Sequence, residues 1–246
     1  MLKTASDLVL NPVKQSRYVA KLCYWSQKYR HIRRDPTTMT AQRGSSPSQP
    51  SLVRCLFHDL RGTWHLNRKL QSGHPSEPSG RCEGKATFTQ TQPSPVLDAD
   101  GKLQIADAEL LYHEEGEFEM DLPNVGQTTD VPKFPFSRKY IWRLQESDDK
   151  VSMSIWFTAP GTNLIDYLFH TVDIVRNDED GDNAENSVIL QGSGGHLCVD
   201  DYYSSSYSFS LSSKHHTSAS LSSWSMKHEV RGPKKDQVIE TTFTRT

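Results

Sequence analysis

The stretch FHDLRGTWHLNR, residues 57–68, decides the fold of this chain. Gly62 supplies a backbone that can bend tightly, and Trp64 is large enough to plug one end of a β-barrel. The residues that follow alternate between two faces. One face carries Trp64, Leu66, Arg68 and Leu70, and the other carries Thr63, His65, Asn67 and Lys69. The stretch therefore predicts the opening strand of a closed barrel.

The same period of two continues along the rest of the chain. Strand-like segments recur at residues 80–88, 109–120, 136–146, 151–157, 165–174, 187–199, 202–211, 224–230 and 238–245. No stretch after residue 52 predicts a helix of three turns. Many strands with short connections and hardly any helix predict a sandwich or a barrel, and the Gly-x-Trp opening favours the barrel. We expect an all-β domain over residues 52–246, a single antiparallel up-and-down barrel of about 8–10 strands, calycin- or lipocalin-like.

The first 51 residues differ in composition from the rest. Residues 1–34 carry eight basic side chains and one acid, and a tract rich in Ser, Thr, Pro and Gln follows. We expect residues 1–51 to be a disordered basic extension. The alternative is a mitochondrial transit peptide, because such segments are Arg-rich, hydroxylated and poor in acids. Whether the segment is cleaved does not follow from its composition.

The remainder of the chain is acidic. Removing the first 34 residues from the chain's 28 basic and 30 acidic side chains leaves 20 and 29, a net charge of −9. Phosphate contacts need clustered Lys and Arg, so this body is not expected to bind nucleic acid. The sequence contains no secretory segment and no apolar run near the ~18 residues that a membrane span needs. Its four cysteines form no C-x-x-C pair. We expect a cytoplasmic protein with reduced thiols, mitochondrial under the transit-peptide alternative, and the oligomeric state stays open.

Several segments, taken in order, resemble one family. They are Leu60-x-Gly62-x-Trp64-x-Leu66-x-Arg68, Gly84-x-Ala86-x-Phe88, Leu111-Tyr112-x-Glu114-x-Gly116, Arg138-x-Tyr140-x-Trp142-Arg143, Phe169-His170, His196-x-Cys198-x-Asp200-x-Tyr202, and Gly232-Pro-Lys-Lys-Asp236 before Phe243-x-Arg245. Over residues 54–246 the chain is similar to the bacterial and fungal family called domain of unknown function 6314. The resemblance implies no particular activity. The Gly-x-Trp start and the late arginine are similar to lipocalin-like barrels, in which a terminal arginine packs over the first-strand tryptophan.

That similarity predicts a structural role for Gly62, Trp64 and Arg245. A guanidinium stacked on an indole contributes ~0.5–2 kcal/mol, depending on desolvation. The contact would tie the first strand to the last and close one end of the barrel, with Arg231 as the other candidate partner of Trp64.

Charged residues on otherwise apolar faces are the first candidates for function. Arg68, Arg138 and Glu114 lie at such positions, and Tyr140 and Trp142 follow Arg138 on the same face. A barrel of this size can hold one small ligand, and interior arginines select an anion through paired hydrogen bonds. The competing interpretation is an internal Arg–Glu pair that rigidifies the wall.

A second group of candidates is His196, Cys198 and Asp200, at period two, with His170 on a neighbouring strand. His with Cys can form a nucleophile pair or bind Zn²⁺. The alternative is a buried cysteine acting as a small hydrophobe beside hydrogen-bonded histidines. We predict no metal site.

The sequence therefore predicts a barrel that binds a small anionic or amphipathic molecule. The second hypothesis is an enzyme, an isomerase, cyclase or hydrolase, with His170 or His196 as general acid or base and Cys198 or Asp200 assisting. The third is a haem-binding barrel with an axial histidine. The sequence requires no cofactor. Convergence of His170, His196, Asp200 and Arg68 in one cavity would favour chemistry over binding.

Overall fold

The computed structural model describes one unit, residues 48–246, with short gaps. The gaps are residues 75, 98–100, 122–131, 148–149, 177–186 and 215–217. Residues 1–47, which hold most of the expected basic extension and the transit-peptide alternative, lie outside the described residues. So does the acidic loop 177–186.

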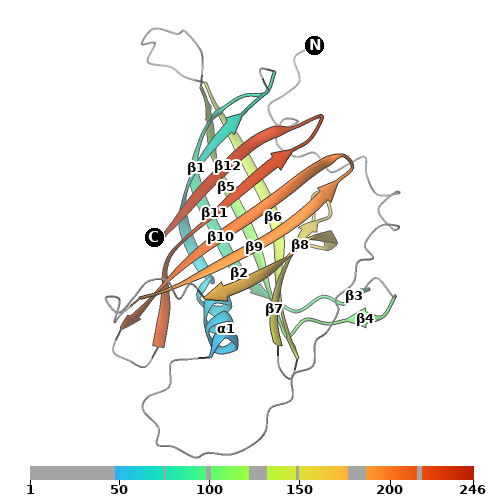
Figure 1. Ribbon diagram of the computed structural model, residues 1–246, viewed down its shortest axis with the longest axis vertical. Coiled ribbons are helices and arrows are strands. Elements are labelled where there is room, and N and C mark those ends of the chain that lie inside the picture. The colour runs from blue at the N-terminus through green and yellow to red at the C-terminus, as the bar shows by residue number, and fades with distance from the viewer. Residues whose placement is uncertain are drawn as a thin grey trace, which may run out of the picture. The chain divides into compact units, whose positions relative to one another are not determined.

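Ten long strands and one helix make up the body of this unit (Figure 1). The elements, in chain order, are α1 (Gln49–Asp59), β1 (Gly62–Ser72), β2 (Gly80–Thr91), the short β3 (Val96–Leu97) and β4 (Leu103–Gln104), β5 (Ala108–Met120), β6 (Lys133–Ser147), β7 (Lys150–Thr158), β8 (Ile165–Arg176), β9 (Ser187–Cys198), β10 (Asp201–Lys214), β11 (Ser218–Arg231) and β12 (Asp236–Arg245).

The ten long strands form a closed antiparallel barrel. Its order is β1-β12-β11-β10-β9-β8-β7-β6-β5-β2, so each strand pairs with its neighbours in sequence once the small β3–β4 hairpin is set aside. The first and last strands close the ring, with Trp64 opposite Arg245 and Ser72 opposite Gln237. The predicted all-β, up-and-down barrel is confirmed. Closure leaves no free sheet edge between β1 and β12.

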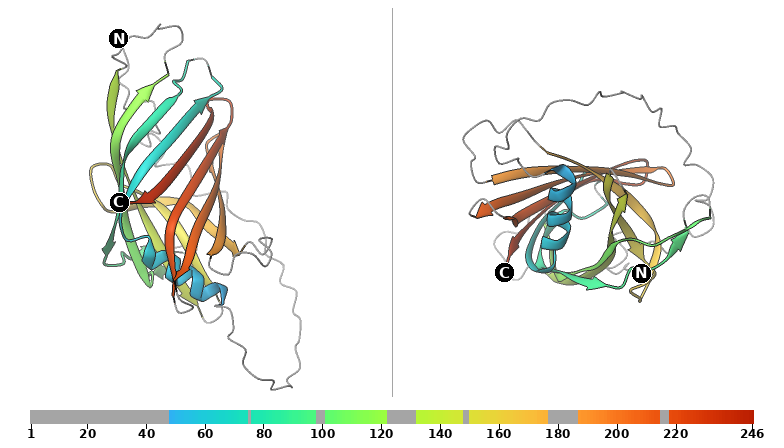
Figure 2. Two further views of the ribbon diagram at one scale, coloured as in Figure 1. Left: turned by 90° about the vertical axis from the view of Figure 1, so that its left-hand side faces the viewer. Right: turned by 90° about the horizontal axis from the view of Figure 1, so that it is seen from below.

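Helix α1 was not predicted: it begins at Gln49, inside the segment expected to be disordered, and ends at Asp59. Pro50 stands in the first turn, where its missing N–H is not needed. The buried residues recur at helical spacing, and they are Leu52, Val53, Leu56, Phe57 and Leu60. The helix lies at one end of the barrel, below the strands in Figure 2. The apolar stripe of α1 is buried because it packs against the end of the barrel.

Two polar contacts fix the C-terminal end of α1 to the barrel. The backbone N–H of Leu221 on β11 donates to the Asp59 carboxylate at 2.9 Å, and the indole N–H of Trp64 donates to the carbonyl of Leu60 at 2.8 Å. At the middle of the helix, Arg54 pairs with Glu146 of β6 at 2.7 Å. The helix therefore closes this end of the barrel, called the floor end below.

A buried ion pair lies on the outer face of β5 and β6, where Glu109 and Arg143 are 3.5 Å apart and are covered at Ser94, in the segment that leads into β3. The backbone N–H of Ser94 donates to Glu109, and Arg143 donates to the carbonyl of Ser94. These bonds satisfy charges that would otherwise be costly to bury. Among the described residues, no helix has both the length and the apolarity needed to span a bilayer.

Candidate functional site

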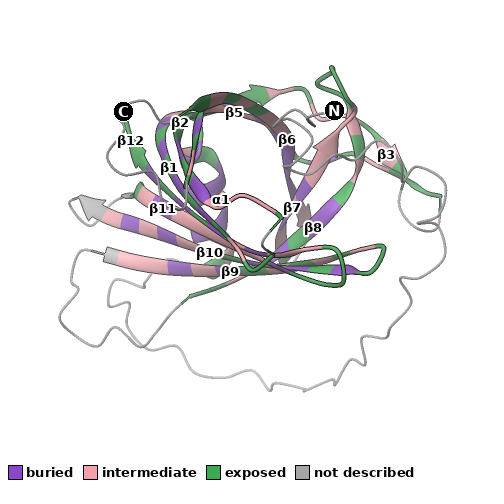
Figure 3. Cartoon of the chain, turned by 90° about the horizontal axis from the view of Figure 1, so that it is seen from above, coloured by how far each residue is buried: buried purple, intermediate pink, exposed green. Residues whose placement is uncertain are grey.

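The interior of the barrel divides into two halves. At the floor end the inward-facing side chains are fully buried. They are Trp64, Leu66, Phe88, Phe209, Trp224 and Phe243, all 0–2% exposed. Toward the other end, called the mouth, several inward-facing side chains are only half-buried. They are Phe136, Arg138, Tyr140, Phe157, Tyr167, His196 and His228. Figure 3 looks into the mouth and shows α1 at the far end.

The floor is an aromatic stack. The Trp224 and Phe243 rings lie parallel with centroids 3.7 Å apart, and Trp64 meets Trp224 edge-on at 6.4 Å. Trp142 also packs edge-on against Trp224, at 5.9 Å, and is 3% exposed. The structure therefore places Trp142, a predicted ligand-binding residue, among the floor side chains.

Arg245 covers the floor from outside. Its guanidinium lies 4.4 Å from the centroid of the Trp64 ring, which is the contact that the sequence predicted. It also donates to the carbonyls of Asp59 and Arg61 at the end of α1. Gly62 has φ +111°, and a Cβ there would stand 3.3 Å from the guanidinium, so the bend and the packing both require glycine.

Arg68 and Glu114 form a buried pair above the floor. Arg68 donates two bonds to the carboxylate, at 2.9 and 2.7 Å, and a third to the Thr241 hydroxyl at 2.9 Å. The Tyr112 hydroxyl donates to the same carboxylate at 2.5 Å. Burial alone lowers the pKa of Arg68, but the neighbouring carboxylate outweighs it, and the pKa lies above its ordinary value. The Arg–Glu pairing considered from the sequence is the geometry found.

The same neighbours keep Glu114 ionised. Burial raises the pKa of its carboxyl, but the charge of Arg68 and the hydrogen bonds from Arg68 and Tyr112 together hold the pKa below its usual range. Arg138 lies opposite Glu114 on β6 and lowers that pKa further. This part of the inner wall thus brings two guanidinium groups close to one carboxylate.

An aromatic wall lines the mouth beside these charges. Phe157 lies at its centre, with ring centroids 4.6 Å from Tyr167, 4.9 Å from Phe169 and 5.6 Å from Tyr140. His196 packs against the same rings, 5.6 Å from Phe169, and is hydrogen-bonded to the Phe169 backbone. Burial lowers the pKa of His196, so its ring adds a neutral polar group to the wall.

A chain of hydrogen bonds crosses the interior beside this wall. His170 Nε2 lies 2.7 Å from the Tyr207 hydroxyl, and Ser205 Oγ lies 2.7 Å from His228 Nδ1. Ser205 also lies within hydrogen-bonding reach of the Tyr207 hydroxyl and influences its pKa, which connects the two pairs. His170, Ser205 and Tyr207 are 1–3% exposed, whereas His228 is half-buried. The chain therefore runs from a fully buried histidine to a half-buried one.

Both histidines of the chain are held neutral. Burial, followed by the nearby His228 and His196, lowers the pKa of His170 to about 3. Burial, followed by the charge of Arg68, lowers the pKa of His228 to about 4. At neutral pH each ring has one N–H donor and one acceptor nitrogen.

Local sequence features make room for the chain. The pairing of β7 with β8 shifts register next to Ile155, so that Phe169 and His170 are both buried. On β9, a Cβ at Gly194 would lie 2.4 Å from the His170 ring, and one at Gly192 would lie 3.1 Å from Tyr207. The glycines of β9 thus occupy the places where the His170 and Tyr207 rings pack.

The remaining predicted residues lie at the rim of the mouth. Cys198 is half-buried at the end of β9, and Asp200 is exposed in the turn to β10. Arg68, His170 and His196 thus share the interior, while Asp200 does not join them. At the same rim, Lys235 donates to the Tyr203 hydroxyl at 3.0 Å, and the Asp201 carboxylate accepts the backbone N–H of Lys234.

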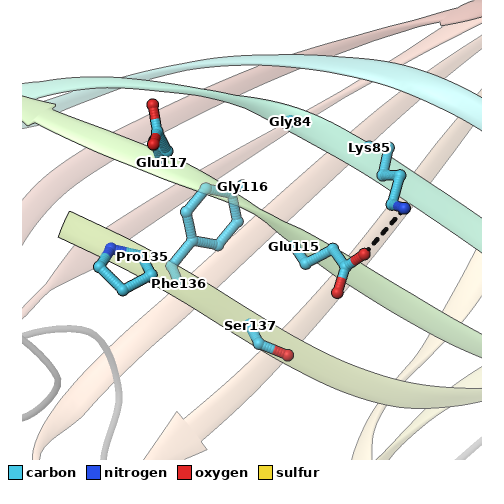
Figure 4. A pocket seen from close by; sticks show the side chains of 8 residues that line it. All are labelled: Gly84, Lys85, Glu115, Gly116, Glu117, Pro135, Phe136 and Ser137. Carbon is cyan, nitrogen blue, oxygen red and sulfur yellow. Dashed lines mark ion pairs between the residues drawn. The ribbon is translucent and has the colours of Figure 1, made fainter. Parts of the chain in front are cut away.

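A shallow groove marks the outer wall where β2, β5 and β6 meet (Figure 4). It forms at Gly84 and Gly116, which face each other so closely that a Cβ on either would lie 2.2 Å from a carbonyl oxygen of the other strand. The Lys85 ammonium pairs with Glu115 at 3.0 Å across it. Its charges are matched and open to solvent, so the interior is the better candidate site.

The described residues contain no group of three or more His, Cys, Asp or Glu side chains placed to hold a metal ion. The model of a family of unknown function, DUF6314, matches residues 60–245. The chain belongs to this family. The match runs from the end of α1 to the last strand, so the DUF6314 region includes the floor, the Arg68–Glu114 pair and the mouth. No curated protein and no solved structure matches the chain.

In this DUF6314 barrel, sequence reasoning missed Ser205, Tyr207 and His228. The pattern that singled out Arg68, a polar residue in an otherwise apolar series, could have found two of them. Ser205 stands in the inward series with Tyr203 and Tyr207, and His228 stands two residues from Val230 in a buried series. A polar residue on an apolar face must be paired or face a wet space.

Proposed function

We propose that this DUF6314 protein binds a small amphipathic anion in the mouth half of its barrel. The observation that carries the proposal is that several inward-facing side chains of the mouth, among them Arg138, Tyr140 and Phe157, are only half-buried, whereas those of the floor are fully buried. A close-packed interior has few voids, so polar and aromatic groups left accessible inside a barrel favour a ligand space.

The charge of the wall supports an anionic group on the ligand. Arg68 holds the Glu114 carboxylate with two bonds, and Arg138 lies opposite Glu114 on β6, so two guanidinium groups stand on this part of the wall. The apolar part of the ligand would lie against the aromatic wall of Tyr140, Phe157 and Tyr167. The expected role of Arg68 is thus to hold Glu114 and shape the wall.

A fluorescent aromatic sulfonate, 8-anilinonaphthalene-1-sulfonate, provides a test because it combines both features. We expect saturable binding at one site, weakened about tenfold by Arg138→Met, since charge-assisted hydrogen bonds contribute ~1.5–3 kcal/mol. Lys139→Met is the matched control, because it removes the same charge from the next residue, on the opposite face of β6. The neutral dye Nile red should show no such difference between the two variants.

Two results would refute the proposal. One is the absence of saturable sulfonate binding to the unmodified protein. The other is an equal loss of affinity for Arg138→Met and Lys139→Met, which would place the probe on the outer surface.

A further inference from the structure

The half-buried end of the hydrogen-bonded chain is the imidazole of His228, and only one of its two nitrogens takes part in the chain. His228 Nδ1 is engaged by Ser205 at 2.7 Å. Among the described residues, no hydrogen bond to its other nitrogen, Nε2, is present, and the ring is only half-buried. His228 lies on the inner face of β11, opposite Ser205. It is close enough to Arg68 and Glu114 for both charges to influence its pKa.

At the opposite end, His170 is 3% exposed and its Nδ1 is enclosed without a hydrogen-bond partner among the described residues. Every member between the two rings can both donate and accept. The hydrogen bonds between His228 and His170 can therefore all point in one direction or all in the other. When Ser205 donates to His228 Nδ1, His228 Nε2 carries the proton; when Nδ1 donates to Ser205, Nε2 is an acceptor.

We propose that His228 Nε2 binds the polar head of the ligand directly, and that the chain through Ser205 and Tyr207 to His170 fixes which tautomer it presents. This inference rests on the proposed function and adds the contact that recognises the ligand. An anionic oxygen selects the state in which Nε2 of His228 is the donor. In that state Ser205 donates to His228, Tyr207 donates to Ser205, and His170 Nε2 donates to Tyr207.

The direction of the chain has a consequence at its far end. Binding an anion at His228 places the proton of His170 on Nε2 and leaves its Nδ1 as the enclosed acceptor. In the opposite direction the enclosed His170 Nδ1 would carry a proton without an acceptor. Both arrangements leave one buried nitrogen unpaired, so they differ little in cost, and a ligand can decide between them. Ser205 and Tyr207 are positioning residues in this arrangement.

Long-range proton–nitrogen correlation spectra of the full chain test the inference, because they report which ring nitrogen carries the proton. With saturating 8-anilinonaphthalene-1-sulfonate, we expect His228 and His170 both to be protonated at Nε2. In Tyr207→Phe, His228 should still respond to the probe, while His170 should no longer follow it. His65, exposed on the outer face of β1, should not change in any sample.

Binding measurements on variants give a second readout. His228→Phe keeps a ring of similar volume and should weaken the sulfonate about tenfold, while His65→Phe should leave its affinity unchanged. Ser205→Ala should weaken it less, about threefold, because His228 remains. If the probe binds but the His228 resonances and the His228→Phe affinity do not change, the inference is wrong and the proposed function stands. If the unmodified protein does not bind the probe, the proposed function itself fails.

Discussion

The floor and the mouth of this barrel are built from the same strands, yet their interiors differ in kind. At the floor, Trp64, Trp224 and Phe243 fill the space completely, and α1 covers them. At the mouth, the same strands present side chains that are only half-buried, such as Arg138, Tyr140 and His228. A single strand such as β1 passes from Trp64 to Arg68 within five residues. The comparison shows that the tightly packed and the partly exposed parts of the interior are separated along the barrel axis.

The strongest test of this difference in packing is to replace one phenylalanine by alanine in each half of the barrel. Phe243→Ala removes a side chain that is 0% exposed and stacked on Trp224, and should lower the free energy of unfolding by about 3–5 kcal/mol. Phe157→Ala removes the same atoms from a half-buried position and should cost less than about 2 kcal/mol. Equilibrium urea unfolding measures both. Equal losses would mean that the mouth is packed as tightly as the floor.

The buried pair at the boundary between the halves gives the next largest effect. Glu114→Gln leaves the Arg68 guanidinium enclosed without its counter-charge and should cost about 3 kcal/mol of unfolding free energy. Glu115→Gln, at the next residue on the outer face, breaks the exposed pair with Lys85 and should change the free energy of unfolding far less. Urea titrations at neutral pH compare the two. If Glu114→Gln lowered the free energy of unfolding no more than Glu115→Gln does, the Arg68–Glu114 pair would not be essential to the stability of the fold.

The neutral histidines of the mouth give a pH dependence that the floor lacks. His170 and His228 have pKa values of about 3 and 4 in the fold, below the ordinary 6.5. The unfolded chain therefore takes up their protons first, so stability is complete above pH 6.5 and falls as the pH drops toward 3. Each histidine contributes a slope of up to about 1.4 kcal/mol per pH unit.

Unfolding between pH 6.5 and 5, before most carboxylates titrate, isolates this contribution. Either His170→Gln or His228→Gln should reduce the slope, and His196, whose pKa burial also lowers, should supply part of what remains. An unaltered slope in both interior variants would show that these histidines are not held neutral by the fold.

The sequence predicted the barrel because period-two alternation is local and survives in every strand. It also predicted the partner of Trp64, at the far end of the chain, by similarity to other barrels. It missed α1 because an apolar stripe such as Leu52, Leu56 and Leu60 has meaning only once a barrel end exists to receive it. The sequence pattern lacked this tertiary context, and short helices depend on packing more than on propensity.

The candidate site was predictable in part. Arg68 was conspicuous as a charge on an apolar face, but whether Glu114 or a ligand would pair with it depended on which strands became neighbours. The hydrogen-bonded chain joins β8, β10 and β11, and Ser205 and His228 are ordinary residue types at ordinary spacing. Their distance of 2.7 Å follows from strand register, which the alternation pattern does not fix between strands.

The central claim is that the mouth half of the interior binds an amphipathic anion. Chemical-shift mapping of the isotope-labelled chain during titration with 8-anilinonaphthalene-1-sulfonate tests it most directly. The account predicts the largest shifts at Tyr140, His196 and His228, with the indole N–H of Trp64 unchanged, because that group is sealed against the carbonyl of Leu60. Shifts confined to outward-facing residues, such as those of the groove at Gly84 and Gly116, would contradict it.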